Sequence, residues 1–284
     1  MLLLAGTLPI KELNLHAGKA RLSDDNIIIG DMSFPINRGS AAMMASCCAV
    51  CNMYDLESPY CVVSGDIGRG NGSEPLYHYL RDKIPQMGVK IAVFHYIMPN
   101  LNYHNEVLNA IKTMKEKPVL IADAGYMYVA KMAGFAGYYD MFTPDLGELA
   151  FLADNEAPHP FYTRGFIIHM EEKAKELIKM AYDGNNAAKF MCIKGTTDYI
   201  CKDGEILKEV SQPSVPELEP IGGTGDTITG MIAAFINKGM TLEDAAVSSV
   251  ITNRFAGQIA KPNPATQIWE IIKSIPLALN EIKQ

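Results

Sequence analysis

The sequence predicts an α/β fold in which a mainly parallel sheet is covered by helices on both faces. Short apolar runs alternate with segments whose apolar residues recur at helical spacing across most of the chain. Several of these runs end directly in a glycine-rich or acidic turn that leads into a helical segment. This alternation favours a three-layer αβα sandwich with short connections between neighbouring elements.

Length and composition fit one large domain. The chain has 284 residues, 48% hydrophobic and 20% charged, so we expect a single domain over 1–284, with residues 1–58 the hardest to assign. The net charge of −7 argues against nucleic acid as a partner. The sequence shows no membrane-length apolar run and no secretory signal, and its six cysteines suit a reducing cytoplasm, which is the expected location.

The elements are expected in a regular order. The first thirty residues give little signal except a short buried strand at 26–31, and a Gly-Ser turn then opens a helix over 40–53. A strand from 59 runs into a glycine-rich loop. Further helices are predicted over 74–84, 105–115, 126–133, 171–182, 242–261 and 266–283, with one more beginning near 147. Further strands are predicted from 88, at 118–123 and in a hairpin over 189–206, and 157–164 reads as an irregular loop.

The most informative stretch is the glycine turn Gly222-Gly-Thr-Gly-Asp226, which precedes a helical segment ending at Lys238-Gly239. The turn lies at a helix N-terminus, where free amides and the helix dipole favour an anion. An acid there has two interpretations. Asp226 could simply cap the first turn, or it could act as a general base beside an anion hole formed by Gly223, Thr224 and Gly225.

This stretch resembles the signature of the ribokinase-like superfamily, which includes sugar kinases, hydroxyethylthiazole kinase and the dehydratases that repair hydrated NAD(P)H. A second stretch, Thr143-Pro-Asp-Leu-Gly-Glu148, is similar to a superfamily motif. It departs from that motif at Asp145, where kinases carry Asn and dehydratases His, and at Leu146, where dehydratases carry Pro. No lid sheet of the sugar-kinase type is evident. The resemblance implies a ribokinase-like αβα sandwich and covers residues 59–261 best.

The resemblance also implies roles for individual residues. Glu148, with Asp145 beside it, would organise Mg²⁺ near the nucleotide phosphates, in keeping with the preference of Mg²⁺ for oxygen ligands. The expected nucleotide-binding residues are Lys194, Gly195, Thr196, Gly222 and Asn253. The expected substrate residues are Asp31, Asn37, Gly39, His95 and Asn100, of which His95 and Asn100 follow a strand end.

Three functions follow from these residues. The first is an ATP- or ADP-dependent phosphotransferase of the carbohydrate-kinase type that acts on a hydroxyl of a small molecule, with Mg²⁺ as cofactor. The second is nucleotide-dependent dehydration of hydrated NAD(P)H, in which the same parts phosphorylate a hydroxyl and phosphate then leaves. The third is a non-catalytic nucleotide sensor, which would have no need of Asp226. The sequence leaves the substrate, the choice between ATP and ADP, and a homo-oligomeric state open.

Overall fold

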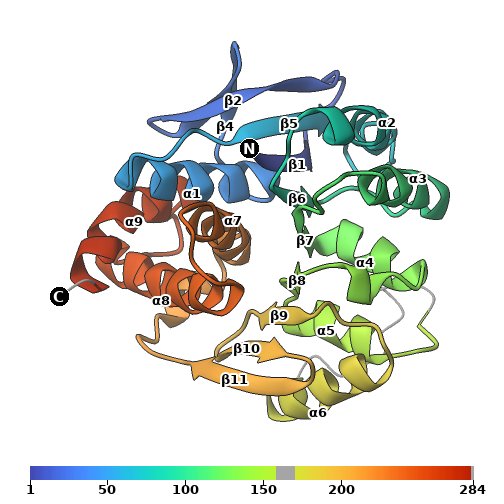
Figure 1. Ribbon diagram of the computed structural model, residues 1–284. Coiled ribbons are helices and arrows are strands. Elements are labelled where there is room, and N and C mark those ends of the chain that lie inside the picture. The colour runs from blue at the N-terminus through green and yellow to red at the C-terminus, as the bar shows by residue number, and fades with distance from the viewer. Residues whose placement is uncertain (158–169, 283–284) are drawn as a thin grey trace.

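The computed structural model of the chain describes residues 1–157 and 170–282 (Figure 1). Its strands are β1 (Leu2–Leu8), β2 (His16–Ser23), β3 (Asn26–Ile29), β4 (Met32–Pro35), β5 (Tyr60–Gly65), β6 (Ile91–His95), β7 (Val119–Asp123), β8 (Met141–Phe142), β9 (Phe190–Ile193), β10 (Asp198–Lys202) and β11 (Glu205–Val210). Its helices are α1 (Ser40–Met53), α2 (Ser73–Lys83), α3 (Leu101–Lys112), α4 (Ala124–Met132), α5 (Leu146–Ala153), α6 (Met170–Asp183), α7 (Thr224–Asn237), α8 (Leu242–Ala260) and α9 (Ile268–Ile282).

The strands form one sheet in the order β11-β10-β9-β8-β7-β6-β1-β5-β2-β3-β4. Neighbours from β9 to β5 pair in parallel, whereas β10–β11 at one end and β2–β4 at the other are antiparallel. The central parallel strands are apolar along nearly their whole length, as strands covered on both faces are.

Helices cover both faces of this sheet. Figure 1 shows α1, α7, α8 and α9 together on one side and α2 to α6 on the other. Each side encloses its own hydrophobic core, because side chains alternate between the two faces along each strand: Leu4 and Val93 join the first core, and Leu3 and Phe94 join the second. The three-layer αβα sandwich with a mainly parallel sheet is therefore confirmed.

The N-terminal segment holds the largest difference from expectation. The first thirty residues gave little signal, yet β1 is a fully buried central strand between β6 and β5. A short, mostly apolar run such as this carries no periodicity that separates a strand from a buried helix, so its place depends on distant partners. The meander β2–β3–β4 continues the same sheet through the β2–β5 pair.

The helices otherwise follow the expected order. Helix α1 has the predicted bounds, while α3 begins four residues earlier than predicted because Asn100 caps it by accepting the amide of Tyr103. A loop was expected over 157–164, and residues 158–164 lie outside the described residues. Within the described ranges, no helix combines the length and apolarity needed to cross a membrane.

Candidate active site

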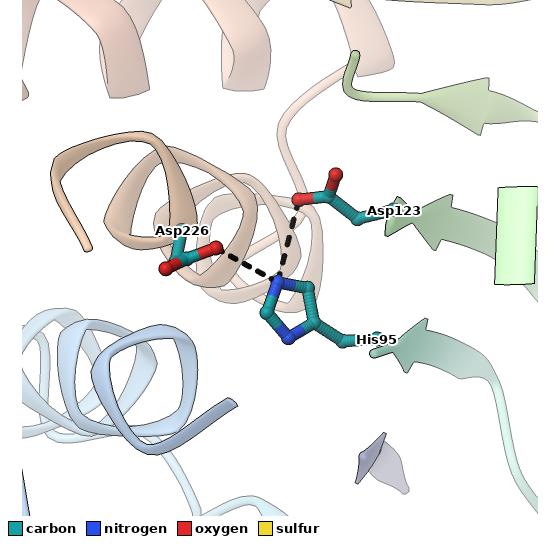
Figure 2. A group of neighbouring side chains, drawn as sticks. All are labelled: His95, Asp123 and Asp226. Carbon is teal, nitrogen blue, oxygen red and sulfur yellow. Dashed lines mark hydrogen bonds and ion pairs between the residues drawn. The ribbon is translucent and has the colours of Figure 1, made fainter. Parts of the chain in front are cut away.

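Three ionisable side chains meet at the carboxyl edge of the parallel strands. His95 ends β6, Asp123 ends the neighbouring β7, and Asp226 lies in the first turn of α7 (Figure 2). His95 Nε2 lies 3.1 Å from Asp226 Oδ1 and 3.5 Å from Asp123 Oδ2. His95 thus links the two carboxylates. In open α/β sheets this edge is where ligands bind.

His95 is held as an imidazolium. Burial favours its neutral form, but the hydrogen bonds it donates to Asp123 and Asp226 outweigh that effect and raise the pKa of His95 to about 9. Its Nδ1 lies 3.0 Å from the hydroxyl oxygen of Ser40, which accepts the second ring proton. At neutral pH the ring therefore donates in both directions and does not serve as a base.

Asp123 balances the charges of the buried cations. Lys194 Nζ lies 3.2 and 3.0 Å from its two carboxylate oxygens, and the Thr229 hydroxyl donates to Oδ2 at 2.7 Å. Burial alone would raise the pKa of Asp123, but the Lys194 charge and the His95 hydrogen bond hold it well below its usual range. Burial opposes the charge of Lys194 as well, yet nearby carboxylates led by Asp123 raise its pKa.

The same charges bear on metal binding. The ligand atoms of His95, Asp123 and Asp226 are close enough together to hold an ion. However, a protonated His95 and Lys194 already neutralise the two carboxylates, so a cation there would have to displace a proton or an ammonium group. This group is better suited to positioning one carboxylate than to coordinating a metal.

Asp226 is the member of the group that retains access to solvent, with 12% of its side chain exposed. Its Oδ2 accepts the amide of Gly39 at 2.8 Å, while Oδ1 faces His95. Gly39 precedes α1 with a positive φ of 64°, a conformation that glycine adopts freely. The carboxylate is therefore fixed from two sides, and it does more than cap a helix.

The glycine turn precedes Asp226 directly. Gly223, the N-cap of α7, has φ 106° and brings no side chain to the helix N-terminus. Gly225 faces the Lys194 side chain, since a Cβ on Gly225 would lie in van der Waals contact, 3.4 Å from Lys194 Cδ. The turn is supported from behind by Asn253, which accepts the Thr227 hydroxyl proton at 2.7 Å and donates to the Thr224 carbonyl. These contacts leave the amides at the start of α7 suited to an anion.

The Lys194 segment is fixed by a buried ion pair. Arg254 donates to Asp198 at 2.8 Å and to the carbonyls of Gly195 and Thr196. The Gly195 amide donates to Asp198 as well. Lys194, Gly195 and Thr196 were expected to bind the nucleotide. The Lys194 side chain contacts Asp123 and lies beside Gly225 of the glycine turn.

Glu148 and Asp145 form a capping box at the start of α5. The Glu148 amide donates to Asp145 and the Asp145 amide donates back to Glu148. The Tyr128 hydroxyl donates to Glu148 at 2.8 Å. Burial, reinforced by the charges of Asp123 and Asp145, raises the pKa of Glu148 to about 8. A divalent cation bound there would favour the charged form of Glu148 in place of its proton, so these oxygen ligands fit Mg²⁺.

The other expected substrate residues lie in different settings. Gly39 and His95 contact Asp226, whereas the Asn100 side chain caps the N-terminus of α3. Asp31 lies at the turn between β3 and β4 with 91% of its side chain exposed and pairs with His16 at 3.4 Å. Asn37 is exposed beside Arg38. Among the described residues, Asp31, Asn37 and Asn100 make no hydrogen bond or ion pair with His95, Asp123 or Asp226.

The sequence prediction missed Asp123, Ser40 and Thr229 as members of this site. Asp123 did carry a signal, because an acidic residue ending a buried strand faces the ligand edge of a parallel sheet. Ser40 begins α1 and Thr229 lies in α7, and nothing in their local pattern separates them from other small core residues.

A second glycine-rich turn, between β5 and α2, is filled by its own anion. The Asp66 carboxylate accepts the amides of Gly68, Arg69, Gly70, Gly72 and Ser73 and the Ser73 hydroxyl, all at 2.9 to 3.2 Å. A phosphate would have to expel this side chain. This turn is therefore less suited to a phosphate than the turn before α7.

Comparisons with known proteins indicate the family of the chain. The profile of the family described as NAD(P)H-hydrate dehydratase matches residues 99–277. An uncharacterised protein of Methanocaldococcus jannaschii is 38% identical over 227 residues, covering 80% of this chain and 93% of that protein. An ADP-dependent (S)-NAD(P)H-hydrate dehydratase of Staphylococcus aureus is 28% identical over 117 residues, 41% of each chain.

Solved structures show the same fold. An ADP/ATP-dependent NAD(P)H-hydrate dehydratase of Bacillus subtilis, co-crystallised with ATP and Mg²⁺, aligns with a TM-score of 0.61 at 16% identity over 99% of this chain and 90% of that one. A Bacillus subtilis pyridoxal kinase in complex with ADP aligns with a TM-score of 0.55 at 12% identity, covering 88% of this chain and 89% of that one. The ribokinase-like fold is thus confirmed.

The comparisons favour the dehydratase interpretation over the carbohydrate-kinase interpretation that the sequence placed first. The matched region includes Asp123, Glu148, Lys194 and Asp226, and begins just after His95. The chain belongs to the NAD(P)H-hydrate dehydratase family of enzymes.

Proposed function

We propose that the protein is an ATP- or ADP-dependent NAD(P)H-hydrate dehydratase. The observation that carries this proposal is the position of Asp226, which follows the glycine turn and is held between His95 and the Gly39 amide. This arrangement supports proton removal from a hydroxyl next to a phosphoryl-binding turn. Membership of the dehydratase family supports a hydrated nicotinamide ring as the carrier of that hydroxyl.

Dehydration by this route needs a better leaving group than hydroxide. Asp226 accepts the proton of the ring hydroxyl. The hydroxyl oxygen bonds to the phosphorus of the terminal phosphoryl group while the P–O bond that joins this group to the nucleotide breaks. The α7 amides and Lys194 hold the negative charge on the phosphoryl oxygens. The C–O bond then breaks with its electron pair on phosphate, and loss of a proton from the adjacent carbon restores the ring double bond.

Glu148 and Asp145 are the residues that would hold Mg²⁺, through water or directly. When bound, the ion neutralises charge on the phosphate oxygens. The capping box fixes both carboxylates relative to α5, and a backbone bridge joins Asp145 to Lys194, which supports a metal site near Lys194. Lys194 thereby connects the proposed metal site to Asp123.

Asp226→Asn tests the base directly. We expect the variant to bind nucleotide as the parent does, because the amide side chain nearly preserves the shape of Asp226. We expect kcat to fall by about 10²- to 10⁴-fold, because an amide cannot accept the hydroxyl proton. The assay follows the absorbance of reduced nicotinamide after adding hydrated NADH, Mg²⁺ and either ATP or ADP, and calorimetry measures nucleotide affinity.

Asp203→Asn is the matched control, since Asp203 is an exposed residue in the turn between β10 and β11. It should leave both quantities unchanged. An Asp226→Asn enzyme with parental kcat would show that another group removes the proton. If the parent restores no NADH with either nucleotide, the dehydratase proposal fails, and a screen of small alcohols for nucleotide consumption then tests the kinase interpretation.

A further inference from the structure

Tyr96, the residue after His95, has a backbone conformation that large side chains rarely adopt. Its φ is 50°, in the left-handed region. A bulky non-glycine residue there is strained, and such strain persists only where the surrounding fold enforces it. Tyr96 also leaves 49% of its surface exposed, while the next residue, Ile97, is fully buried. The turn after β6 therefore buries the smaller apolar side chain and presents the larger one to solvent.

The contacts of Tyr96 place its ring beside the charged group. Thr7, in the neighbouring strand β1, donates its hydroxyl proton to the Tyr96 carbonyl and pins the strained backbone. The ring meets the His95 imidazole edge to face, with centroids 4.6 Å apart and an interplanar angle of 81°. Its edge lies about 3.7 Å from where a Cβ on Gly39 would stand. His95 and Gly39 are the two residues that fix Asp226.

Other large apolar side chains are exposed in the chain segments next to Tyr96 in sequence and in the loop after β5. Met98 and Leu101, in the same turn and the helix after it, are 40% and 43% exposed, and Ile67, after β5, is 50% exposed. The Met98 amide donates to the Ser73 hydroxyl, so the β6 turn is tied to the loop that carries Ile67. An aromatic ring next to the residues that hold the Asp226 carboxylate suits a substrate that has an apolar ring face and a hydroxyl at its rim.

We propose that Tyr96 determines substrate specificity by stacking on the hydrated nicotinamide ring, which directs the ring hydroxyl toward Asp226. This inference rests on the proposed dehydratase function. The strained backbone is retained because it aims the aromatic ring at the substrate instead of at the core. Tyr96 then contributes to binding of the hydrated dinucleotide and leaves nucleotide binding at the α7 turn unaffected.

Tyr96→Gly separates this role from a structural one. Glycine adopts a positive φ without strain, so we expect the variant to unfold at the same or higher denaturant concentration than the parent. The loss of stacking should raise KM for hydrated NADH by about tenfold. KM for the nucleotide should stay within experimental error, and Tyr96→Phe should keep the parental KM for hydrated NADH.

Asp55→Gly is the matched control, because Asp55 is an exposed residue with φ 52° beyond the end of α1. It should relieve backbone strain in the same way and leave every KM unchanged. An active Tyr96→Gly enzyme with parental KM for hydrated NADH would overturn the role of Tyr96 alone. A parent enzyme that restores no NADH would overturn the proposed function and this inference with it.

Discussion

His95 differs from its neighbours at the site because it links two carboxylates without being a base itself. Its raised pKa keeps it charged at neutral pH, and its Nε2 donates a hydrogen bond to Asp226 Oδ1. Ser40 and Asp123 fix the ring orientation from the other directions. We therefore regard His95 as a positioning residue, which acts on the substrate through Asp226.

His95→Gln should reveal this role in the pH profile. In the parent, kcat should fall as pH rises through about 9, because the neutral imidazole no longer supports Asp226. In the variant, kcat should be lower by about tenfold near neutral pH and the alkaline decline should disappear, since glutamine does not titrate. Steady-state rates between about pH 7 and 10 measure both effects.

His78→Gln, on α2, is the control and should keep the parental profile. If His95→Gln retained the same decline near pH 9, another group would be responsible for it.

At the scale of elements, the turn between β5 and α2 is organised by one side chain. Six hydrogen bonds converge on the Asp66 carboxylate. Gly68 and Gly70, in the same turn, have positive φ angles. Burial raises the pKa of Asp66, but the loop amides and the Ser73 hydroxyl more than compensate and lower it. Because Ser73 also accepts the Met98 amide, this turn supports the β6 turn that carries Tyr96.

Asp66→Asn should lower the free energy of unfolding by about 3 kcal/mol at neutral pH, because an amide group replaces one charged acceptor oxygen with a donor. The folded pKa of Asp66 is depressed, so its contribution is present above the unfolded pKa near 3.8 and is lost as pH falls below it. The gap between parent and variant should therefore shrink in acid.

Urea denaturation at neutral pH and near pH 3 measures this gap. Asp31→Asn, at an exposed carboxylate, should match the parent at both pH values. A gap that stays constant into acid would mean that the Asp66 charge contributes nothing to stability.

Elements with strong local signals were predictable, and those defined by distant pairing were not. Helix α1 begins after a glycine turn and runs through small apolar residues, and its predicted bounds match the structure. Strand β1 carries no local mark of its central position. Likewise, the glycine turn identified Asp226, but the approach of Asp123 depends on the register that sets it opposite His95. Such a register is fixed by packing of whole strands, which local patterns do not encode.

At the scale of the whole molecule, two buried histidines give the free energy of unfolding opposite pH dependences. Burial lowers the pKa of His104 to about 4, whereas the carboxylates overcome burial and raise that of His95 to about 9, both from 6.5. The stabilisation from His104 is complete above pH 6.5 and is lost as pH falls toward 4. The stabilisation from His95 is complete below pH 6.5 and is lost as pH rises toward 9.

For His104 the expected loss between pH 6.5 and 4 is about 3 kcal/mol. His104→Gln should lower stability at neutral pH, because it disturbs the contact with the Tyr139 hydroxyl, but it should flatten this acid slope. Chemical denaturation across this pH range measures the slope in parent and variant. An equally steep acid decline in His104→Gln would assign it to carboxylates instead.

The order of the sheet has a last consequence, which concerns aggregation. Its outermost strands, β4 and β11, have one free backbone edge each within the described sheet. Strand β11 carries Glu205, Lys208 and Glu209 at exposed positions, and β4 is short and ends in Pro35, which lacks an amide hydrogen. Charge and proline are the means by which natural sheets discourage edge-to-edge pairing. We therefore expect the two edges of this sheet to resist pairing with a second copy of the chain, even at high protein concentration.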